Sequence, residues 1–117
     1  MSDRPVLILL YDILESAEKI ENYITGINFQ TFSENSMIRD AVERNIEIIG
    51  EAVGKLPEEF KNSNNNIQWH KPVGMRNRLI HGYFAVDIPM LWNTITKILP
   101  DFKTEIGLLI ENEEKGK

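Results

Sequence analysis

Apolar residues recur every three or four positions along most of the chain, and this spacing defines the buried face of an α-helix. The first such segment covers residues 5–25, and Gly26 is placed to end it. A connector follows over residues 27–35. The next periodic segment covers residues 36–56 and has an apolar stripe wide enough for burial on more than one side. The first half of the chain therefore predicts two long helices.

The middle of the chain predicts a short turn, a polar loop and a third main helix. The turn covers residues 58–61 after Pro57, and an asparagine-rich loop follows it. The helix is expected over residues 70–81. Pro72 then lies in its first turn, where a missing N–H costs little, and Gly82 stands at its C-cap.

The clearest apolar stripe belongs to the last helix, over residues 88–110. Asp87 is expected to cap its N-terminus, and Pro89 lies just inside its start. Pro100 should kink this helix or divide it. No segment shows the strict alternation of a β-strand. The predicted fold is all-α, with one domain over residues 1–117 formed by an antiparallel bundle of four main helices and a short fifth.

Composition limits where such a protein works. The balance of 42% hydrophobic and 26% charged residues is that of a soluble globular domain. The chain has no cysteine, which excludes disulfides and thiolate metal sites and makes a reducing cytoplasm the expected location. The longest early apolar run, residues 6–10, is too short for a signal peptide or a membrane span. We therefore expect a cytoplasmic protein with no membrane association.

Charge is unevenly distributed. The formal net charge is -5, which taken alone argues against a nucleic-acid binder, because phosphate contacts need Lys and Arg. Residues 61–86, however, contain no Asp or Glu and carry four Lys or Arg and both histidines. This segment has a formal charge of +4, and subtraction leaves about -9 for the remainder. These positive charges either cluster by chance or form a local surface that binds a polyanion.

Arg76 is the first candidate for chemistry. It shares a helical face with Val73 and Ile80, which are core-type residues, so its guanidinium could be half buried. A buried guanidinium cannot lose its charge and needs a carboxylate or a phosphate as partner. Glu47 or Glu51 on the preceding helix would supply the carboxylate if Arg76 forms a structural ion pair.

His81 and Tyr83 are the second and third candidates. His81 ends the same helix, where the helix dipole favours its protonated form, so it could cap the helix or exchange protons with a substrate. Tyr83 follows Gly82 and its hydroxyl could turn toward the same place. The chain has no Gly-rich phosphate loop, and its two histidines, eleven residues apart, do not favour a zinc site. No cofactor and no metal are expected.

Two longer strings resemble a known family. The spacing of Arg76, His81 and Tyr83 matches the Arg-x4-His-x-Tyr motif of HepT-like HEPN proteins. Residues 74–84 as a whole are similar to that family's longer signature. Residues 44–52 resemble the family's second-helix pattern. The chain departs from the family in having Gln68-Trp69 where members often carry Pro-Trp, which affects where the motif helix begins.

The resemblance implies a fold, an activity and partners. HEPN proteins are α-helical bundles that usually form homodimers, with the two motif copies meeting in a cleft at the interface. Many are metal-independent endoribonucleases. HepT-like members are typically toxins encoded beside a minimal nucleotidyltransferase antitoxin, which can transfer AMP to the motif tyrosine and silence the toxin. In this chain that tyrosine is Tyr83.

Carried to this sequence, the resemblance implies a ribonuclease centred on Arg76 and His81. His81 would act as base or acid, Arg76 would stabilise the phosphorane charge, and Asn77 would orient His81 or the phosphate. RNA cleavage would leave a 2′,3′-cyclic phosphate. Two alternatives remain open: a non-catalytic HEPN subunit that binds a nucleotide or a nucleotidyltransferase partner, and a structural bundle in which Arg76 only forms an ion pair.

Overall fold

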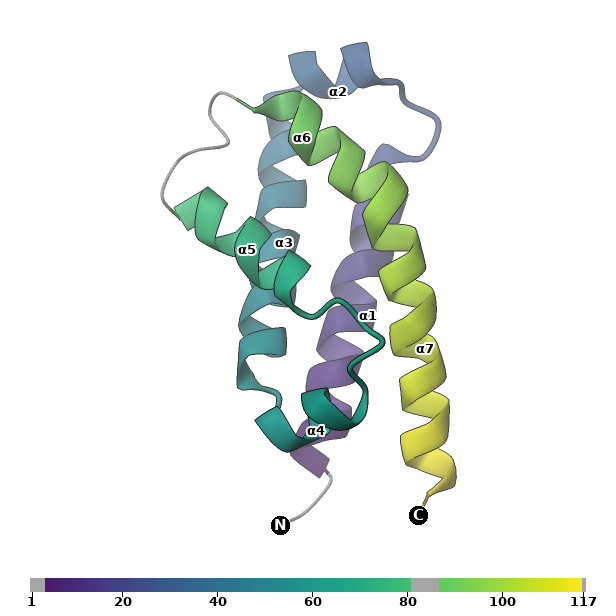
Figure 1. Cartoon of the computed structure of the whole chain (residues 1–117). Coiled ribbons are helices and arrows are strands. Elements are labelled where there is room, and N and C mark those ends of the chain that lie inside the picture. The colour runs from purple at the N-terminus through teal and green to yellow at the C-terminus, as the bar shows by residue number, and fades with distance from the viewer. Residues whose placement is uncertain (1–3, 81–86, 117) are drawn as a thin grey trace.

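The regular structure is entirely helical over the residues that the computed structural model describes, 4–80 and 87–116 (Figure 1). The prediction of an all-α fold is therefore confirmed. The three longest helices coincide with the strongest apolar stripes of the sequence. In chain order the elements are α1 (Arg4–Ile24), α2 (Phe29–Glu34), α3 (Ser36–Lys55), α4 (Glu58–Ser63), α5 (His70–Ile80), α6 (Ile88–Asn93), the π-helical turn η2 (Thr94–Ile98) and α7 (Leu99–Lys115).

The long helices α1, α3 and α7 form the body of the molecule, and α1 packs against both of the others (Figure 1). The start of α1 and the end of α7 lie at the same end, so these two helices run antiparallel. α2 covers the opposite end, and α5 crosses α3 at an angle. This crossing sets the position of the predicted site, because α5 carries Arg76.

The core forms where the apolar stripes of these helices meet. Fully buried side chains include Leu10 and Ile13 of α1, Val42 of α3, Ile95 of η2 and Ile106 of α7. Each such side chain stabilises the fold by about 1.5–3 kcal/mol relative to leaving it exposed.

Two side-chain contacts fix the register of α1 against α7. Lys103 Nζ lies 2.7 Å from Glu21 Oε1, and this hydrogen bond raises the pKa of Lys103. At the other end the Tyr11 hydroxyl donates to Glu114 Oε2 at 2.6 Å, which raises the pKa of Tyr11. The antiparallel pairing is therefore tied at both ends.

The expected connector between the first two long helices contains the short helix α2. Asn28 caps it, because its side-chain oxygen accepts a hydrogen bond from Thr31 N at 2.9 Å. Phe32 is completely buried and lies 5.0 Å from the ring of Trp92, measured between centroids. Asn35 ends α2 and caps α3 through Ile38 N, so one residue serves both helices.

The last helix is interrupted before Pro100, where a kink or break was predicted. Asp87 caps α6 as expected, with its carboxylate accepting from Met90 N at 3.1 Å. Residues 94–98 then form the π-helical turn, and the N–H of Leu99 donates to Thr94 O, five residues back. The wider turn accommodates the proline, which has no N–H to donate and whose ring needs room beside the preceding turn.

No helix in the described part of the chain is both long and apolar enough to cross a membrane.

Candidate functional site

The motif helix α5 packs against α3, and the contact between Arg76 and Gly50 is especially close. A Cβ added to Gly50 of α3 would lie 2.5 Å from Arg76 Cβ and 2.8 Å from Arg76 Cδ, so only glycine fits beneath this side chain. Gly50 itself is buried. The family-like string of α3 and the motif of α5 therefore meet at Gly50 and Arg76.

The Arg76 side chain is partly buried, which is the case in which its charge needs a partner. Its Nε is buried, and no described group accepts a hydrogen bond from it. Of the two carboxylates considered as partners, Glu47 lies 3.4 Å from Arg44 Nη1 and Glu51 is exposed. The ion pairs seen in residues 4–80 and 87–116 do not include Arg76. The structure thus gives no support to a structural ion pair with either glutamate.

Only part of the predicted catalytic set lies within the described residues. Asn77 is on α5, next to Arg76 in the chain, and is exposed. His81, Gly82 and Tyr83 lie outside the described residues. The roles assigned to Arg76, Asn77, His81 and Tyr83 remain predictions.

An acidic patch on α3 lies toward the start of that helix. Glu43 is partly buried, and this burial raises its pKa, with Asp40 and Glu47 adding to the effect and Arg39 opposing it. Glu43 thus sits in a place that disfavours its own charge.

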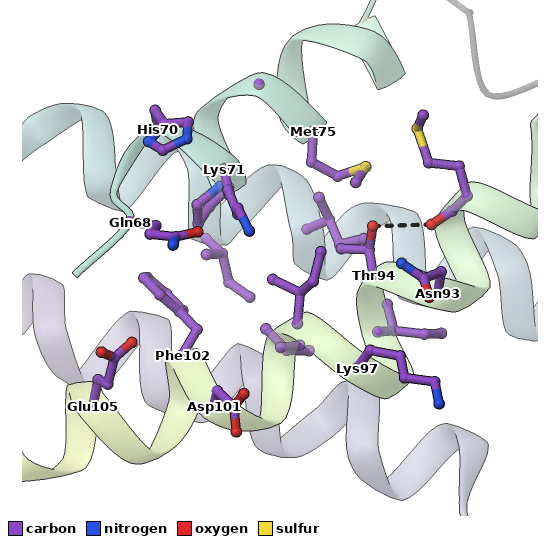
Figure 2. A pocket seen from close by; sticks show the side chains of 18 of the residues that line it. Gln68, His70, Lys71, Met75, Asn93, Thr94, Lys97, Asp101, Phe102 and Glu105 are labelled. Atoms are coloured by element: carbon purple, nitrogen blue, oxygen red, sulfur yellow. Dashed lines mark hydrogen bonds between the residues drawn. The ribbon is translucent and has the colours of Figure 1, made fainter. Parts of the chain in front are cut away.

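A large groove opens on α5, separate from Arg76. Its volume is about 910 Å³, within the range of ligand cavities. Its floor includes Ile46 and Ile49 of α3, and Met75 of α5 faces the continuous stretch α6–η2–α7 across it (Figure 2). Phe102 of α7 closes the floor and packs edge-on against Trp69, with ring centroids 6.0 Å apart. The groove exists because α5 packs chiefly on α3, leaving space between itself and α7.

Charged side chains surround this apolar floor. His70, Lys71 and Arg78 lie on the α5 side and Lys97 on the η2 side, and all four are exposed. The basic partners of the ion pairs found in the described part of the chain are Lys19, Arg44, Lys61 and Lys103, none of which lines the groove.

The acid-free segment identified in the sequence contributes unequally to this surface. Lys61 is held in the fold, since its Nζ lies 3.1 Å from Glu58 Oε1 and donates to Val53 O at 3.3 Å. Lys71 and Arg78 remain at the groove, where Arg78 also contacts the Met90 sulfur on α6. The segment therefore supplies a local cationic surface through Lys71 and Arg78, whereas Lys61 does not contribute to it.

Sequence reasoning missed the groove as a whole. His70 and Lys71 were visible in the acid-free segment, but Lys97 lies outside it, and its approach to them depends on how α5 crosses α3. Met75 packs against the core with part of its side chain and also lines the groove. Within residues 4–80 and 87–116, no group of three or more His, Asp or Glu side chains could hold a metal ion.

The described fold is that of a small all-α protein, and the helix that carries Arg76 rests on a glycine of its neighbour. The sequence model described as "Ribonuclease HepT-like" matches residues 13–108, which include α3, α5 and the whole Arg-x4-His-x-Tyr motif. The chain belongs to the HepT-like ribonuclease family. The resemblance noted in the sequence is therefore confirmed.

Relatives of known name agree with this assignment. A Methanocaldococcus jannaschii protein named "Putative RNase" is 41% identical over 109 residues, covering 93% of this chain and 100% of the relative. A Thermococcus cleftensis protein named "Probable ribonuclease HepT" is 40% identical over 94 residues, covering 80% of this chain and 86% of the relative. A second M. jannaschii protein, named "Gamma-glutamylcyclotransferase and putative RNase", is 41% identical, and the match covers 51% of its length. No solved structure matches the chain significantly.

Proposed function

We propose that this protein is a metal-independent endoribonuclease and the toxin of a toxin–antitoxin pair. The observation that carries the proposal is the partly buried Arg76 guanidinium, whose Nε meets no described acceptor, on the helix that bears the family motif. A phosphate would satisfy such a group by bidentate contact. Family membership and the names of the relatives support RNA as the source of that phosphate.

The proposed reaction is a transesterification within the RNA strand. His81 acts as base or acid: one imidazole removes the proton of the 2′-hydroxyl, whose oxygen attacks the adjacent phosphorus. The bond to the 5′-oxygen breaks, and this oxygen receives a proton as it leaves. Arg76 stabilises the charge on the phosphorane, and Asn77 orients His81 or the phosphate. The products are a 2′,3′-cyclic phosphate and a 5′-hydroxyl.

The proposed active form is a homodimer. Each protomer has one motif histidine, whereas the reaction needs a base and an acid, and a two-fold axis would supply both from equivalent residues. Light scattering at micromolar concentration should give twice the 13.5 kDa mass of the chain. A monomeric mass under conditions where RNA is cut would remove the shared site.

The proposed regulation is AMP transfer to Tyr83 by a minimal nucleotidyltransferase antitoxin. The tyrosine oxygen would form a bond to the α-phosphorus of ATP, and pyrophosphate would leave. The added phosphate brings bulk and negative charge to the place where the RNA phosphate binds, which is sufficient for inhibition. Mass spectrometry of the protein coexpressed with its neighbouring gene product should show AMP on the Tyr83 peptide.

The deciding experiment is cleavage of RNA by the purified protein in the presence of EDTA. We expect cleavage that persists in EDTA and yields cyclic phosphate ends, and we expect His81→Ala to abolish it while leaving the circular dichroism spectrum unchanged. Cleavage that requires Mg²⁺, or that survives His81→Ala, would contradict the proposal.

One observation favours the non-catalytic alternative, a nucleotide- or partner-binding subunit of a nucleotidyltransferase. The net charge of -5 is unusual for an enzyme that must bind a polyanion. Calorimetry distinguishes the two: tight nucleotide binding together with inactivity on varied RNAs would establish the binding subunit.

A further inference from the structure

We propose that the groove between α5 and the α6–η2–α7 stretch is a binding subsite for a nucleotide of single-stranded RNA. The inference rests on the proposed ribonuclease function and assigns a second place where the substrate is held. Arg76 is not among the described residues that line the groove, although its neighbours Met75 and Arg78 on α5 are.

The shape of the groove suits a base and its phosphate. The floor is apolar and recessed, closed by Phe102, which is only 5% exposed, and the partly buried Met75 can pack against the face of a base. Around it stand the side-chain amides of Gln68 and Asn93, labelled in Figure 2, which can donate to and accept from a base edge. This combination of an apolar floor and a few polar groups is typical of ligand cavities.

Charge sets the direction in which the strand would lie. His70, Lys71 and Arg78 line the α5 side, whereas Asp101 and Glu105 lie on α7 (Figure 2). Phosphates would therefore follow α5, away from the two carboxylates. The protein as a whole is acidic, but one wall of the groove carries exposed cations. These cations make the groove electrostatically suitable for a polyanionic strand.

The large apolar side chains that are most exposed lie elsewhere. Met37 of α3, Leu108 of α7 and Ile8 of α1 are 82%, 56% and 45% exposed, and none of them lines the groove. A protein interface normally has exposed aromatic and aliphatic residues at its centre. This distribution favours RNA over a second copy of the chain as the occupant of the groove.

The test measures binding of an eight-nucleotide RNA of mixed sequence with 2′-fluoro groups, which cannot be cleaved because the nucleophilic hydroxyl is absent. The groove variant is Lys71→Ala with Arg78→Ala, two exposed cations of the α5 wall. The matched control is Lys55→Ala with Lys115→Ala, two exposed lysines outside the groove. Fluorescence anisotropy gives Kd as a function of salt concentration.

We expect the groove variant to raise Kd about tenfold and to lower the slope of log K against log salt by about 1.4, the value for two lost phosphate contacts on a single strand. The control should change Kd less than about twofold. Asp101→Asn with Glu105→Gln should change binding in the opposite direction and lower Kd. Equal weakening by the groove variant and the control would overturn the proposal, because binding would then be non-specific.

Further measurements separate the outcomes. RNA containing 4-thiouridine should crosslink to peptides that contain Met75 or Phe102, and crosslinks elsewhere alone would count against the groove. If the groove variant turns a dimer into a monomer in light scattering, the groove holds a second copy and the proposal fails. If the variant binds and cuts RNA like the wild type, the groove proposal fails while the ribonuclease function stands. If the wild type binds the octamer at the groove but cuts no RNA, the proposed function fails and the subsite stands.

Discussion

Arg76 lies directly above Gly50, so close that a methyl group on Gly50 would overlap its Cβ and Cδ. The contact joins the two parts of the sequence that resemble the family, one on α3 and one on α5. The Arg76 side chain therefore packs directly on the backbone of Gly50. We expect the position of Arg76 to depend on Gly50, although Gly50 has no side chain that could take part in the chemistry.

Gly50→Ala should displace α5 and lower both stability and activity. The added Cβ would meet Arg76 at 2.5 Å, and overpacking of this kind costs about 1–3 kcal/mol, more than the gain in helix propensity returns. Chemical denaturation measures the loss, and RNA cleavage should fall with it. Gly54→Ala, one turn further along α3, is the matched control: nothing lies within 4 Å of its added Cβ, so it should stabilise the helix by about 0.5–1 kcal/mol. Equal stability of the two variants would contradict the close packing.

Arg76→Met should separate catalysis from structure. Since no described acceptor meets Nε, replacing the guanidinium with an apolar chain of similar length should leave the free energy of unfolding within about 1 kcal/mol. Cleavage should fall at least about 100-fold, because a group that stabilises transition-state charge is lost. Arg76→Lys should also be impaired, since an ammonium group lacks the planar fork. A variant that unfolds readily yet cuts RNA normally would establish the structural ion pair instead.

Glu43→Gln should stabilise the protein near neutral pH and have little effect in acid. Burial raises the pKa of Glu43, so the folded state binds its proton more tightly than the unfolded state does. Stability from this group is thus greatest at low pH and falls as pH rises from its ordinary pKa of 4.5 through the raised folded value. We expect a gain of at most about 0.5 kcal/mol at pH 7 and none well below pH 4.5. Thermal unfolding across this range measures the difference, and a constant difference would contradict the effect of burial.

Asp87→Ala should weaken the start of α6 by about 1 kcal/mol, because Met90 N would lose its side-chain acceptor. Asp87→Asn retains an oxygen that can accept this hydrogen bond and should be nearly neutral. The free energies of unfolding of the two variants provide the comparison. Similar losses in both would show that the carboxylate charge, rather than the cap, is what matters.

The sequence predicted those parts of the fold that depend on local pattern. The long stripes of α1, α3 and α7 and the cap at Asp87 each follow from residues a few positions apart. Helix α2 was missed because its six residues are too few to show a period, although Asn28 and Asn35 are good capping residues. Helix α5 begins at His70, where the sequence predicted it to begin.

The sequence motif indicated Arg76 as a candidate site residue, but it could not indicate the contact with Gly50 or the groove, which depend on how the helices pack. Partial burial of Arg76 follows from its place on the stripe with Val73, but its contact with Gly50 depends on how two helices cross. The groove depends on the same crossing and brings Lys97 toward Lys71 from a distant part of the chain. His81 and Tyr83, the motif residues beyond α5, stay predictions.

The π-helical turn also has a signal in the sequence. Leu91, Ile95 and Leu99 are all buried and follow each other in two successive steps of four, which an α-helix would carry progressively away from the core. The wider turn over Thr94–Ile98 removes this drift and keeps the three on one side.

The extra residue in that turn therefore governs how α7 is rotated relative to α6, which is inclined to it (Figure 1). If the same residues wound as a regular α-helix, everything beyond them would rotate by roughly 100°. Phe102 and Asp101 would then leave the groove, and the wall facing α5 would lose its continuity. A change of winding at this turn, which itself supplies Thr94, Ile95 and Lys97 to the lining, would thus reshape the cavity even with every residue kept.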